Sequence, residues 1–444
     1  MLIENEKICV ADVELSDQLI NKLLYKHKNI VDNRFTKLND YYKGKHAILN
    51  RVIDDRAKPN NRAVTNFCAY CTDTLTSIFM GKPVTYTIKD SAYKKELIKI
   101  FKNNDETSEN HTLAHKASVK GQAFELVFLN EEGQICFDSL DTDGIIPIYN
   151  TNIRSELSMA LRYYKEKDIL TEIETMIVEV YTKDMIYTYH KRDNALKLIS
   201  QKPHFFGEVP VIEYANNRFR RSDFEGIMHL NDLYNLNQAD VSNDISWFSN
   251  CYLVLENMDG TTTEDVNKLK EDRVLLTGEN GKAYYLTKQL DDSVIQNNRD
   301  NLKEDIHKMS YIPDLSQELP ANLSGSAIKQ KWFSTLNVIS NKERMFKKAL
   351  LKRLRLITTI LNLKGNNFNT NDVDILFNQN IPLNMTEFAD STSKLAGILP
   401  DQILFELLNK NGLEIDVDRA IELKAEQNES INLDTIPIEG DLVG

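Results

Sequence analysis

The sequence predicts an α+β fold, and three segments of different character carry that prediction. Residues 1–120 place their apolar side chains mainly at helical spacing. Residues 123–214 contain short runs rich in β-branched and aromatic residues, separated by turn signals such as Glu132-Gly133, which indicates an antiparallel sheet. Residues 326–364 contain neither glycine nor proline, so one long helix is expected there.

Composition limits the class of protein. The chain has 444 residues, of which 41% are hydrophobic, enough for a sizeable core and for about two to four domains. No apolar stretch approaches the roughly 20 residues of a membrane span, and the first residues lack the layout of a signal peptide, so a cytosolic protein is expected. The five cysteines are odd in number and widely scattered, which predicts reduced thiols.

Charge is distributed unevenly along the chain. The net charge of −12 argues against a protein that holds nucleic acid tightly. Residues 385–444 carry 13 acidic and 4 basic side chains and hold most of the excess. Residues 342–355 have the opposite balance, with Glu343 as the one acidic residue. The basic residues of this run are Lys342, Arg344, Lys347, Lys348, Lys352, Arg353 and Arg355.

The N-terminal region contains a predicted helix over about 64–80 that Gly81, a suitable C′ residue, and Pro83 would end. Cys68 and Cys71 form a CxxC pair within this apolar run. A zinc site would need a second such pair, so we interpret both thiols as core residues. The β-rich segment that follows is expected to form strands over 124–129, 159–164, 175–181 and 185–189.

Two helices are predicted to flank a small β insert. Ser222 is a suitable N-cap for a helix that extends to about residue 251, and apolar spacing predicts a second helix over 289–311. Short strands are expected between them, over 252–288.

A loop bounded by Pro313 and Gly325 precedes the uninterrupted helix. At about 1.5 Å per residue that helix would be roughly 58 Å long. Its apolar stripe is longer than one compact domain usually covers, so we expect a neighbouring subunit to bury it. A short strand over 373–377 and helices near 386–396, 401–410 and 417–428 would complete the chain.

No motif for catalysis or cofactor binding is found. Residues 278–282 lack the spacing and the Ser/Thr of a phosphate-binding loop and are interpreted as a hairpin turn. His111 and His115 have no third ligand at fixed spacing, so an exposed polar face is expected. Asp141 and Asp143 begin like a calcium loop without its terminal glutamate, which favours a turn. The sequence thus predicts no catalytic residue, no metal and no cofactor.

Two charged helix faces leave alternatives open. Asp232, Asp240 and Asp244 recur at multiples of four, which favours a solvated face; a surface facing a DNA passage is the alternative. The basic run over 342–355 favours pairing with acidic partners across subunits, with DNA contact and an ordinary solvated face as alternatives. The candidate interface residues are Lys347, Lys348 and Lys352.

Three groups of residues follow one another in a specific order. The first is Lys58-Pro-Asn-Asn-Arg62 with Asn66 and Gly81-Lys-Pro-Val-Thr-Tyr86. The second is Val209-Pro-Val-Ile-Glu-Tyr-Ala-Asn-Asn217, then Ser222-Asp-Phe-Glu-Gly226, Asp232 and Asn235. The third is Pro313-Asp314, Asn322-Leu-Ser-Gly-Ser-Ala327 and Lys342-Glu-Arg344. Together they resemble the portal (head-to-tail connector) proteins of tailed bacteriophages, of the long-tailed siphophage type, over roughly residues 30–430.

The resemblance implies a portal fold and a ring-forming subunit. An α/β wing (1–221, completed by 365–384) would carry a stem of two helices (222–251 and 289–311) that ends in a small β clip (252–288). A tunnel loop (312–325) would join the stem to a long spine helix (326–364), and a helical crown (385–444) would follow. The tunnel loop would lie nearest the DNA, with the candidate channel residues Pro313, Asp314, Leu315, Ser316, Gln317, Glu318, Leu319 and Asn322.

The resemblance also implies a function. Twelve copies would form a ring at one capsid vertex, in the host cytoplasm during assembly and then in the virion, through which double-stranded DNA is packaged and ejected. The partners would be the terminase large subunit, the major capsid and scaffolding proteins and later the head–tail adaptor, with no membrane contact. The alternatives are a non-ring minor capsid or scaffold-binding protein, and a phage DNA-processing enzyme.

Overall fold

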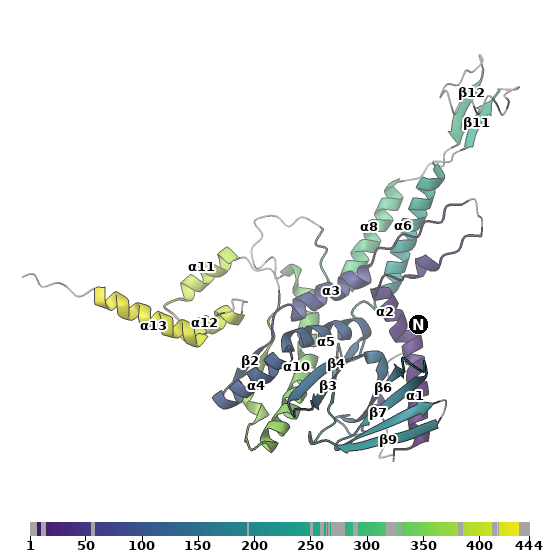
Figure 1. The fold of residues 1–444 in the computed structure, drawn as a ribbon. Helices are drawn as coiled ribbons and strands as arrows, with labels where there is room; N and C mark the ends of the chain where they lie inside the picture. The colour runs from purple at the N-terminus through teal and green to yellow at the C-terminus, as the bar shows by residue number, and fades with distance from the viewer. Residues whose placement is uncertain are drawn as a thin grey trace, which may run out of the picture.

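The computed structural model describes residues 7–9, 15–54, 58–192, 195–248, 252–257, 280–286, 292–316, 327, 330–380, 385–410, 415 and 417–434, with isolated residues between 262 and 267. Figure 1 shows an α/β body from which two helices project side by side, with a small two-stranded sheet at their far end. Three C-terminal helices lie off one side of the body. The mixed α+β class expected from the sequence is confirmed.

The larger sheet of the body has six strands in the order β1-β5-β6-β7-β8-β9. All neighbouring pairs are antiparallel except β1 with β5. Helix α1 (Asp17–Ile30) covers one face of this sheet with Ile20 and Leu23, which are buried against residues such as Leu161 and Val178. The strands are β1 (Ile8–Cys9), β5 (Ile145–Tyr149), β6 (Leu157–Lys167), β7 (Glu174–Tyr181), β8 (Met185–Arg192) and β9 (Ala195–Pro203).

A second sheet and its helices form the main core. Strands β10 (Val211–Ala215), β3 (Gln122–Leu129) and β4 (Ile135–Leu140) are antiparallel, and β13 (Val373–Leu376) pairs with β2 (Thr85–Ile88). The four strands expected between 124 and 189 are therefore present, as β3, β6, β7 and β8. The helical elements of this region are the π-helix η1 (Val31–Phe35), α2 (Thr36–Tyr42), the 3-10 helix η2 (Ala47–Asn50), α3 (Phe67–Met80), α4 (Ser91–Asn103), α5 (Glu106–Lys120) and α10 (Phe333–Leu363).

Gly81 ends α3 as expected, but for a different reason. Its φ of −72° is right-handed, not the left-handed conformation in which a C′ glycine is favoured. A Cβ at this position would lie 2.2 Å from the carbonyl oxygen of Ser77, so glycine is required by the close approach of the backbone.

The projecting helices are α6 (Met228–Phe248) and α8 (Asp292–Met309), and the sheet beyond them pairs β11 (Tyr252–Glu256) with β12 (Lys282–Leu286) in antiparallel register. The expected N-cap at Ser222 is wrong, since α6 begins at Met228. The Ser222 hydroxyl donates to the carbonyl of Ser118 at 2.9 Å and so anchors the preceding turn to α5. The hairpin turn predicted over 278–282 lies mostly outside the described residues.

The long helix α10 does not need a neighbouring subunit to bury its apolar stripe, so that expectation is wrong. Its core-facing residues pack within the same chain against α3, β10 and β3, in the main core. These residues are no more than 5% exposed: Ile339, Phe346, Leu350, Leu354, Ile357 and Leu361. The stripe is covered because the body itself is long enough to run beside the helix (Figure 1).

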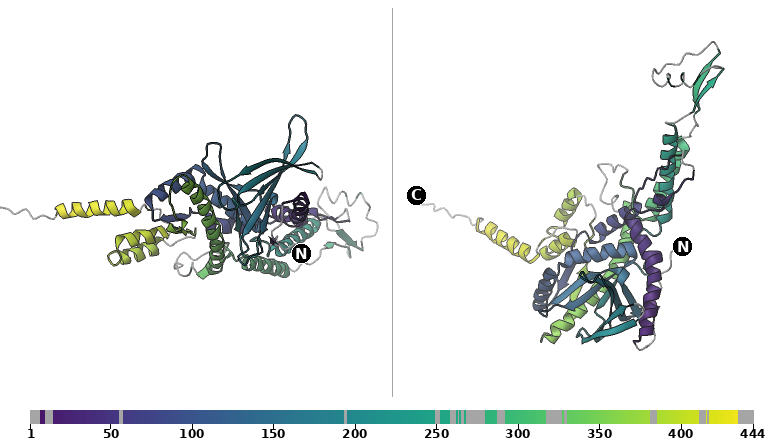
Figure 2. Two further views of the ribbon diagram at one scale, coloured as in Figure 1. Left: turned by 90° about the horizontal axis from the view of Figure 1, so that it is seen from below. Right: turned by 45° about the vertical axis from the view of Figure 1, so that its right-hand side comes forward.

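The C-terminal region contains the three expected helices. They are α11 (Met385–Leu395), α12 (Asp401–Lys410) and α13 (Val417–Asp434). Both views of Figure 2 show α13 extending outward from the rest of the chain. Among the described residues, no helix is both long and apolar enough to span a membrane.

Candidate functional site

The predicted channel loop begins with a turn that is bonded to α8. Asp314 accepts hydrogen bonds from the backbone N–H of Ser316 at 2.9 Å and from its hydroxyl at 2.7 Å. The Lys303 ammonium lies 2.9 Å from the Asp314 carboxylate. Partial burial opposes ionisation, yet the bonds from Lys303 and Ser316 hold the pKa of Asp314 well below its usual range. The Asp314 charge is therefore compensated within the subunit, and it fixes the start of the loop to α8.

The other candidate channel residues divide into two sets. Pro313 is half-buried, whereas Leu315 and Ser316 are exposed. Four lie outside the described residues, namely Gln317, Glu318, Leu319 and Asn322.

The three aspartates of α6 only partly fit a solvated face, because Asp240 is 52% exposed whereas Asp232 and Asp244 are half-buried. Tyr41 donates its hydroxyl hydrogen to Asp232 at 2.6 Å, and burial together with this bond raises the pKa of Tyr41. Arg51 pairs with Asp240 at 2.6 Å, and Asp244 is half-buried and also has a partner. Asp232 and Asp240 therefore lie toward residues 41–51, where Arg51 compensates the charge of Asp240.

A strap of extended chain, residues 58–67, lies against the same helix and was not foreseen. The amide oxygen of Asn243 accepts from the N–H of Asn61 at 2.7 Å, and that of Asn235 accepts from the N–H of Thr65 at 2.8 Å. Asn231 donates to the carbonyl of Thr65 at 2.8 Å. The strap thus runs antiparallel to α6. The asparagines at four-residue spacing, two of which are fully buried, were the available signal.

The basic run on α10 is also engaged within its own chain. Lys342 and Arg353 are 2% and 1% exposed and form ion pairs with Asp223 and Glu125. Pairing across subunits, which the sequence favoured, and its alternatives, DNA contact and a solvated face, are therefore wrong for these two residues. Because they lie at core-facing positions of the apolar stripe, their spacing relative to Phe346 could have identified them as buried cations.

Arg353 is the centre of a buried network that joins α10 to α5 and β3. It donates to both carboxylate oxygens of Glu125, at 2.9 and 2.5 Å, and to Asn110 at 2.8 Å. The guanidinium lies 4.4 Å from the centre of the Phe137 ring, and Tyr214 donates to Glu125 at 2.9 Å. This arrangement satisfies a charge pair that would otherwise be costly to bury.

The three candidate interface lysines differ from one another. Lys352 donates to the carbonyl of Val211 at 2.9 Å, and burial lowers its pKa to about 8. Lys347 lies 3.9 Å from Asp374 of the same chain, a pair that is largely exposed. A role across subunits stays a prediction for Lys347 and Lys348, while Lys352 is occupied by its own subunit.

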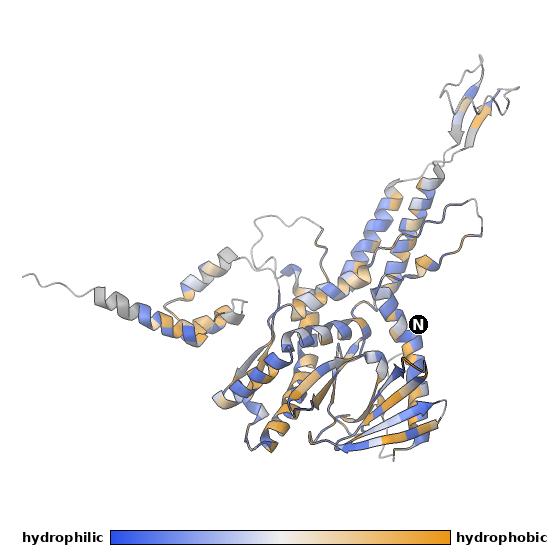
Figure 3. Ribbon diagram, in the orientation of Figure 1, coloured by the Kyte–Doolittle hydropathy of each residue, from blue (hydrophilic) through white to orange (hydrophobic). Residues whose placement is uncertain are grey.

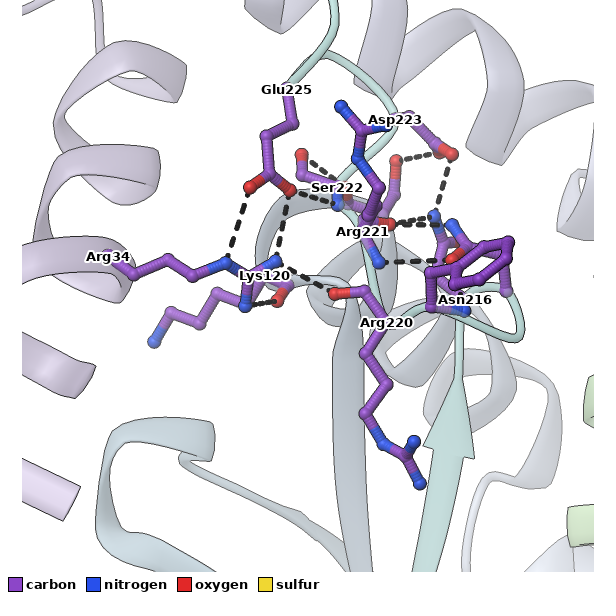
Figure 4. Close-up of polar contacts among 11 residues, drawn as sticks. Arg34, Lys120, Asn216, Arg220, Arg221, Ser222, Asp223 and Glu225 are labelled. Atoms are coloured by element: carbon purple, nitrogen blue, oxygen red, sulfur yellow. Dashed lines mark hydrogen bonds and ion pairs between the residues drawn. The ribbon is translucent and has the colours of Figure 1, made fainter. Parts of the chain in front are cut away.

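A polar junction joins β10, α5, η1 and α6 (Figure 4). Arg34 lies 3.0 Å from Glu225 and donates to the carbonyl of Arg220 at 2.8 Å. Asn216 donates to the carbonyl of Arg221 at 3.0 Å and to Asp223 at 2.7 Å.

Gly121 makes this packing possible. Its φ is +83°, and a Cβ would lie 1.9 Å from the carbonyl oxygen of Arg220. The segment 209–226, which carried the family resemblance, therefore serves to position the first residues of α6 relative to the body.

The residues weighed as metal or redox sites have structural roles. Cys68 and Cys71 are buried, which raises the pKa of both thiols, so the interpretation as core residues is confirmed. His111 is exposed, but His115 is half-buried and lies 2.9 Å from the Tyr42 hydroxyl, which corrects the expected polar face. Asp141 caps the expected turn, the 3-10 helix Thr142–Gly144. Within the described part of the chain, no group of three or more potential ligands could hold a metal ion.

Comparison with known proteins covers nearly the whole chain. Residues 20–432 match the family described as phage portal protein, SPP1 Gp6-like. The portal protein of Bacillus phage SPP1 is 24% identical over 335 residues, which span 72% of this chain and 65% of that protein. The portal protein of Clostridium phage phiCD119 is 25% identical over 413 residues, which span 88% of this chain and 90% of that protein.

Two similar solved structures come from gene transfer agent particles. The first, a particle neck computed with C12 symmetry, has a TM-score of 0.46 at 8% identity and covers 77% of this chain and 89% of its own. The second, from the virion of a native gene transfer agent, has a TM-score of 0.45 at 9% identity with the same coverage. The family match over residues 20–432 decides the assignment: the chain belongs to the SPP1 Gp6-like family of phage portal proteins.

Proposed function

We propose that this chain is one subunit of a closed ring at a single capsid vertex, through which double-stranded DNA is packaged and later ejected. The observation that carries the proposal is the pair α6–α8, which stands off the α/β body and ends in the β11–β12 sheet (Figure 1). In a member of the portal family, this pair corresponds to the stem and the sheet to the clip. The loop 312–325 is then the tunnel loop, α10 the spine helix and α11–α13 the crown.

The division into wing and crown has support from strand pairing. After α10 the chain returns to the body, where β13 pairs with β2 from the N-terminal region. Residues 365–384 therefore belong with the wing in this proposal, and the crown begins at α11.

Exposed apolar side chains on the stem support ring formation. Leu233 and Ile245 on α6 are 52% and 62% exposed, and Val294 on α8 is 61% exposed. Figure 3 shows hydrophobic residues at intervals along both helices. Apolar groups that one subunit leaves in water are typical of a subunit contact, and a repeated head-to-tail contact closes into a ring. Twelve copies is the number that the family resemblance implies.

The net charge of the chain favours a channel through which DNA slides over a surface that binds DNA tightly. Each lysine or arginine placed on a phosphate releases counterions and adds affinity, so a basic lining would hold DNA. The net charge of −12 supports a lining that does not hold DNA, and the cations Arg51 and Lys303 are already paired with Asp240 and Asp314. The energy for transport would come from the terminase large subunit, which docks on the ring before the head–tail adaptor replaces it. Capsid and scaffolding proteins would surround the ring in the virion vertex.

Particle size tests the ring directly. Light scattering after size exclusion, with negative-stain images of the same fractions, should show rings of about twelve times the 51.1 kDa chain. A stable monomer or small oligomer at all protein concentrations would instead favour the non-ring minor capsid or scaffold-binding alternative. The DNA-processing enzyme is no longer an alternative, because portal proteins are structural and not enzymatic.

Glu318→Lys tests the proposed channel position. A cation facing the duplex would grip its backbone, so we expect intact rings but less DNA packaged per capsid. The matched control is Glu131→Lys, an equal charge change at an exposed turn between β3 and β4. Equal packaging in the two variants would show that residue 318 does not face the DNA.

A further inference from the structure

Helix α4 carries a stripe of exposed lysines on an otherwise acidic chain. Lys94, Lys95, Lys99 and Lys102 are all exposed, and Ile98 between them is 53% exposed. The other face of the helix is buried in the main core by Tyr93, Leu97 and Ile100. The subunit therefore folds without using the lysine stripe, which is left available to a partner.

Helix α13 presents a complementary stripe. Glu422, Leu423 and Glu426 are exposed, with Leu423 at 52%. The glutamates are four residues apart, as are Lys95 and Lys99, so each pair spans about 6 Å along its helix axis.

The two stripes match in order as well as in spacing. If the helices run antiparallel, Lys95 faces Glu426 and Lys99 faces Glu422. The same alignment places Ile98 against Leu423. The two ion pairs would then flank an apolar contact, which is the usual arrangement at an interface between helices.

The remaining charges near these stripes do not oppose the match. Glu96 of α4 is half-buried, and the N-cap Asp90 accepts from the N–H groups of Ala92 and Tyr93 at 2.8 and 3.0 Å. Arg419, one turn before Glu422, already has a partner, and Lys424, between the two glutamates, pairs with Asp401.

A second copy of the chain is the occupant that the observations favour. Figure 1 shows α13 extending outward from the body that carries α4. Region 385–444 holds 13 acidic and 4 basic residues, which makes it the most acidic partner that the chain itself offers. DNA is the competing anion, but it has no counterpart to the exposed Ile98.

We propose that α13 of one subunit docks antiparallel on α4 of a neighbouring subunit, with Glu422 and Glu426 on Lys99 and Lys95. The proposal rests on the ring proposed above and adds a contact between the crown and the wing. The contact would be electrostatic in large part, so it should weaken as salt is raised.

Charge exchange tests this contact. K95E/K99E and E422K/E426K should each lower the salt concentration at which rings dissociate, and the four substitutions combined should restore it. The matched control is K22E/K26E, the same change at the same spacing on exposed positions of α1. If both double variants form rings that dissociate at the same salt concentration as wild type, the proposed contact is wrong, although the proposed ring is not.

Crosslinking gives a second measurement that does not depend on stability. With Ile98→Cys and Leu423→Cys together, copper phenanthroline should produce a ladder of covalent multimers on a non-reducing gel, and neither single variant should. A crosslink within one chain, or none, would overturn the proposal. If K95E/K99E instead lowers the affinity for a labelled DNA duplex and leaves ring stability unchanged, the stripe is a DNA contact and the proposal fails.

Discussion

Helix α10 and the pair α6–α8 place their side chains in opposite ways. On α10, charged residues such as Lys342 and Arg353 are buried, and each meets a carboxylate from another part of the chain. On α6 and α8, apolar residues such as Leu233, Ile245 and Val294 are left exposed. The core-facing side of α10 is therefore covered within its own subunit, whereas α6–α8 leaves apolar side chains exposed in the described part of the chain.

The largest expected effect is on α10. Arg353→Met leaves Glu125 buried without its partner, which should cost about 3–5 kcal/mol of unfolding free energy. Arg355→Met is the matched control, because its pair with Glu208 is half exposed and should contribute at most about 1 kcal/mol. Urea denaturation of both variants measures the difference. Similar losses would mean that burial does not distinguish the two arginines.

A buried histidine gives the α/β body a pH-dependent stability. Burial lowers the pKa of His27 to about 4, below its value near 6.5 in the unfolded chain. The unfolded state therefore takes up a proton first, and stability falls as pH drops from about 6.5 to 4, by up to about 3 kcal/mol.

Substitution isolates this contribution. His27→Gln should flatten the stability profile between pH 6.5 and 4, whereas His229→Gln, at an exposed position on α6, should not. Thermal unfolding at several pH values compares them. A profile unchanged by His27→Gln would assign the acid sensitivity to other groups.

Substitutions of exposed apolar residues on the stem should lower the yield of rings and hardly change the stability of the subunit. Leu233→Gln with Ile245→Gln changes exposed positions, so the unfolding free energy should move by less than about 0.5 kcal/mol. The yield of rings should fall, because the contact loses its apolar part. Lys37→Gln, at an exposed position on α2, serves as a surface control for yield. Rings formed at the wild-type yield would show that these side chains do not line a subunit contact.

The smallest effect concerns the remaining interface lysines. Lys347→Glu with Lys348→Glu breaks one long, exposed ion pair with Asp374, which should change subunit stability by less than about 0.5 kcal/mol. If these residues pair across subunits, rings of this variant should dissociate at lower salt. Unchanged salt resistance would remove both residues from the interface.

Helices and strands could be predicted from the sequence where a single local pattern was strong. The absence of glycine and proline over 326–364 predicts α10, and β-branched runs predict β6–β8, because spacing and propensity act over a few residues. The start of α6 was misplaced because Ser222 has a suitable side chain whose hydroxyl is used by Ser118, which is 104 residues away. Sequence spacing carries no information on such a partner.

In the candidate site, too, the partners of the functional residues are distant in the sequence and could not be predicted from spacing. The charges on α10 were visible, but their partners Asp223 and Glu125 lie 119 and 228 residues away in the chain. The strap on α6 depends likewise on asparagines that pair with residues about 170 to 180 positions earlier. The family resemblance predicted the arrangement of segments, and the contacts give structural roles to residues of its first two motif groups, such as Asn61 and Asn235.

The strap along α6 has a mechanical consequence. Its bonds reach from Asn231 to Ser246 of the helix, which corresponds to about 22 Å of axial length. A force along the helix axis would load these bonds together in shear. A sideways force on the far end of α6 would instead load them one after another. A force along the axis of α6 would therefore be shared by these bonds and carried through residues 58–67 to α3 and the body.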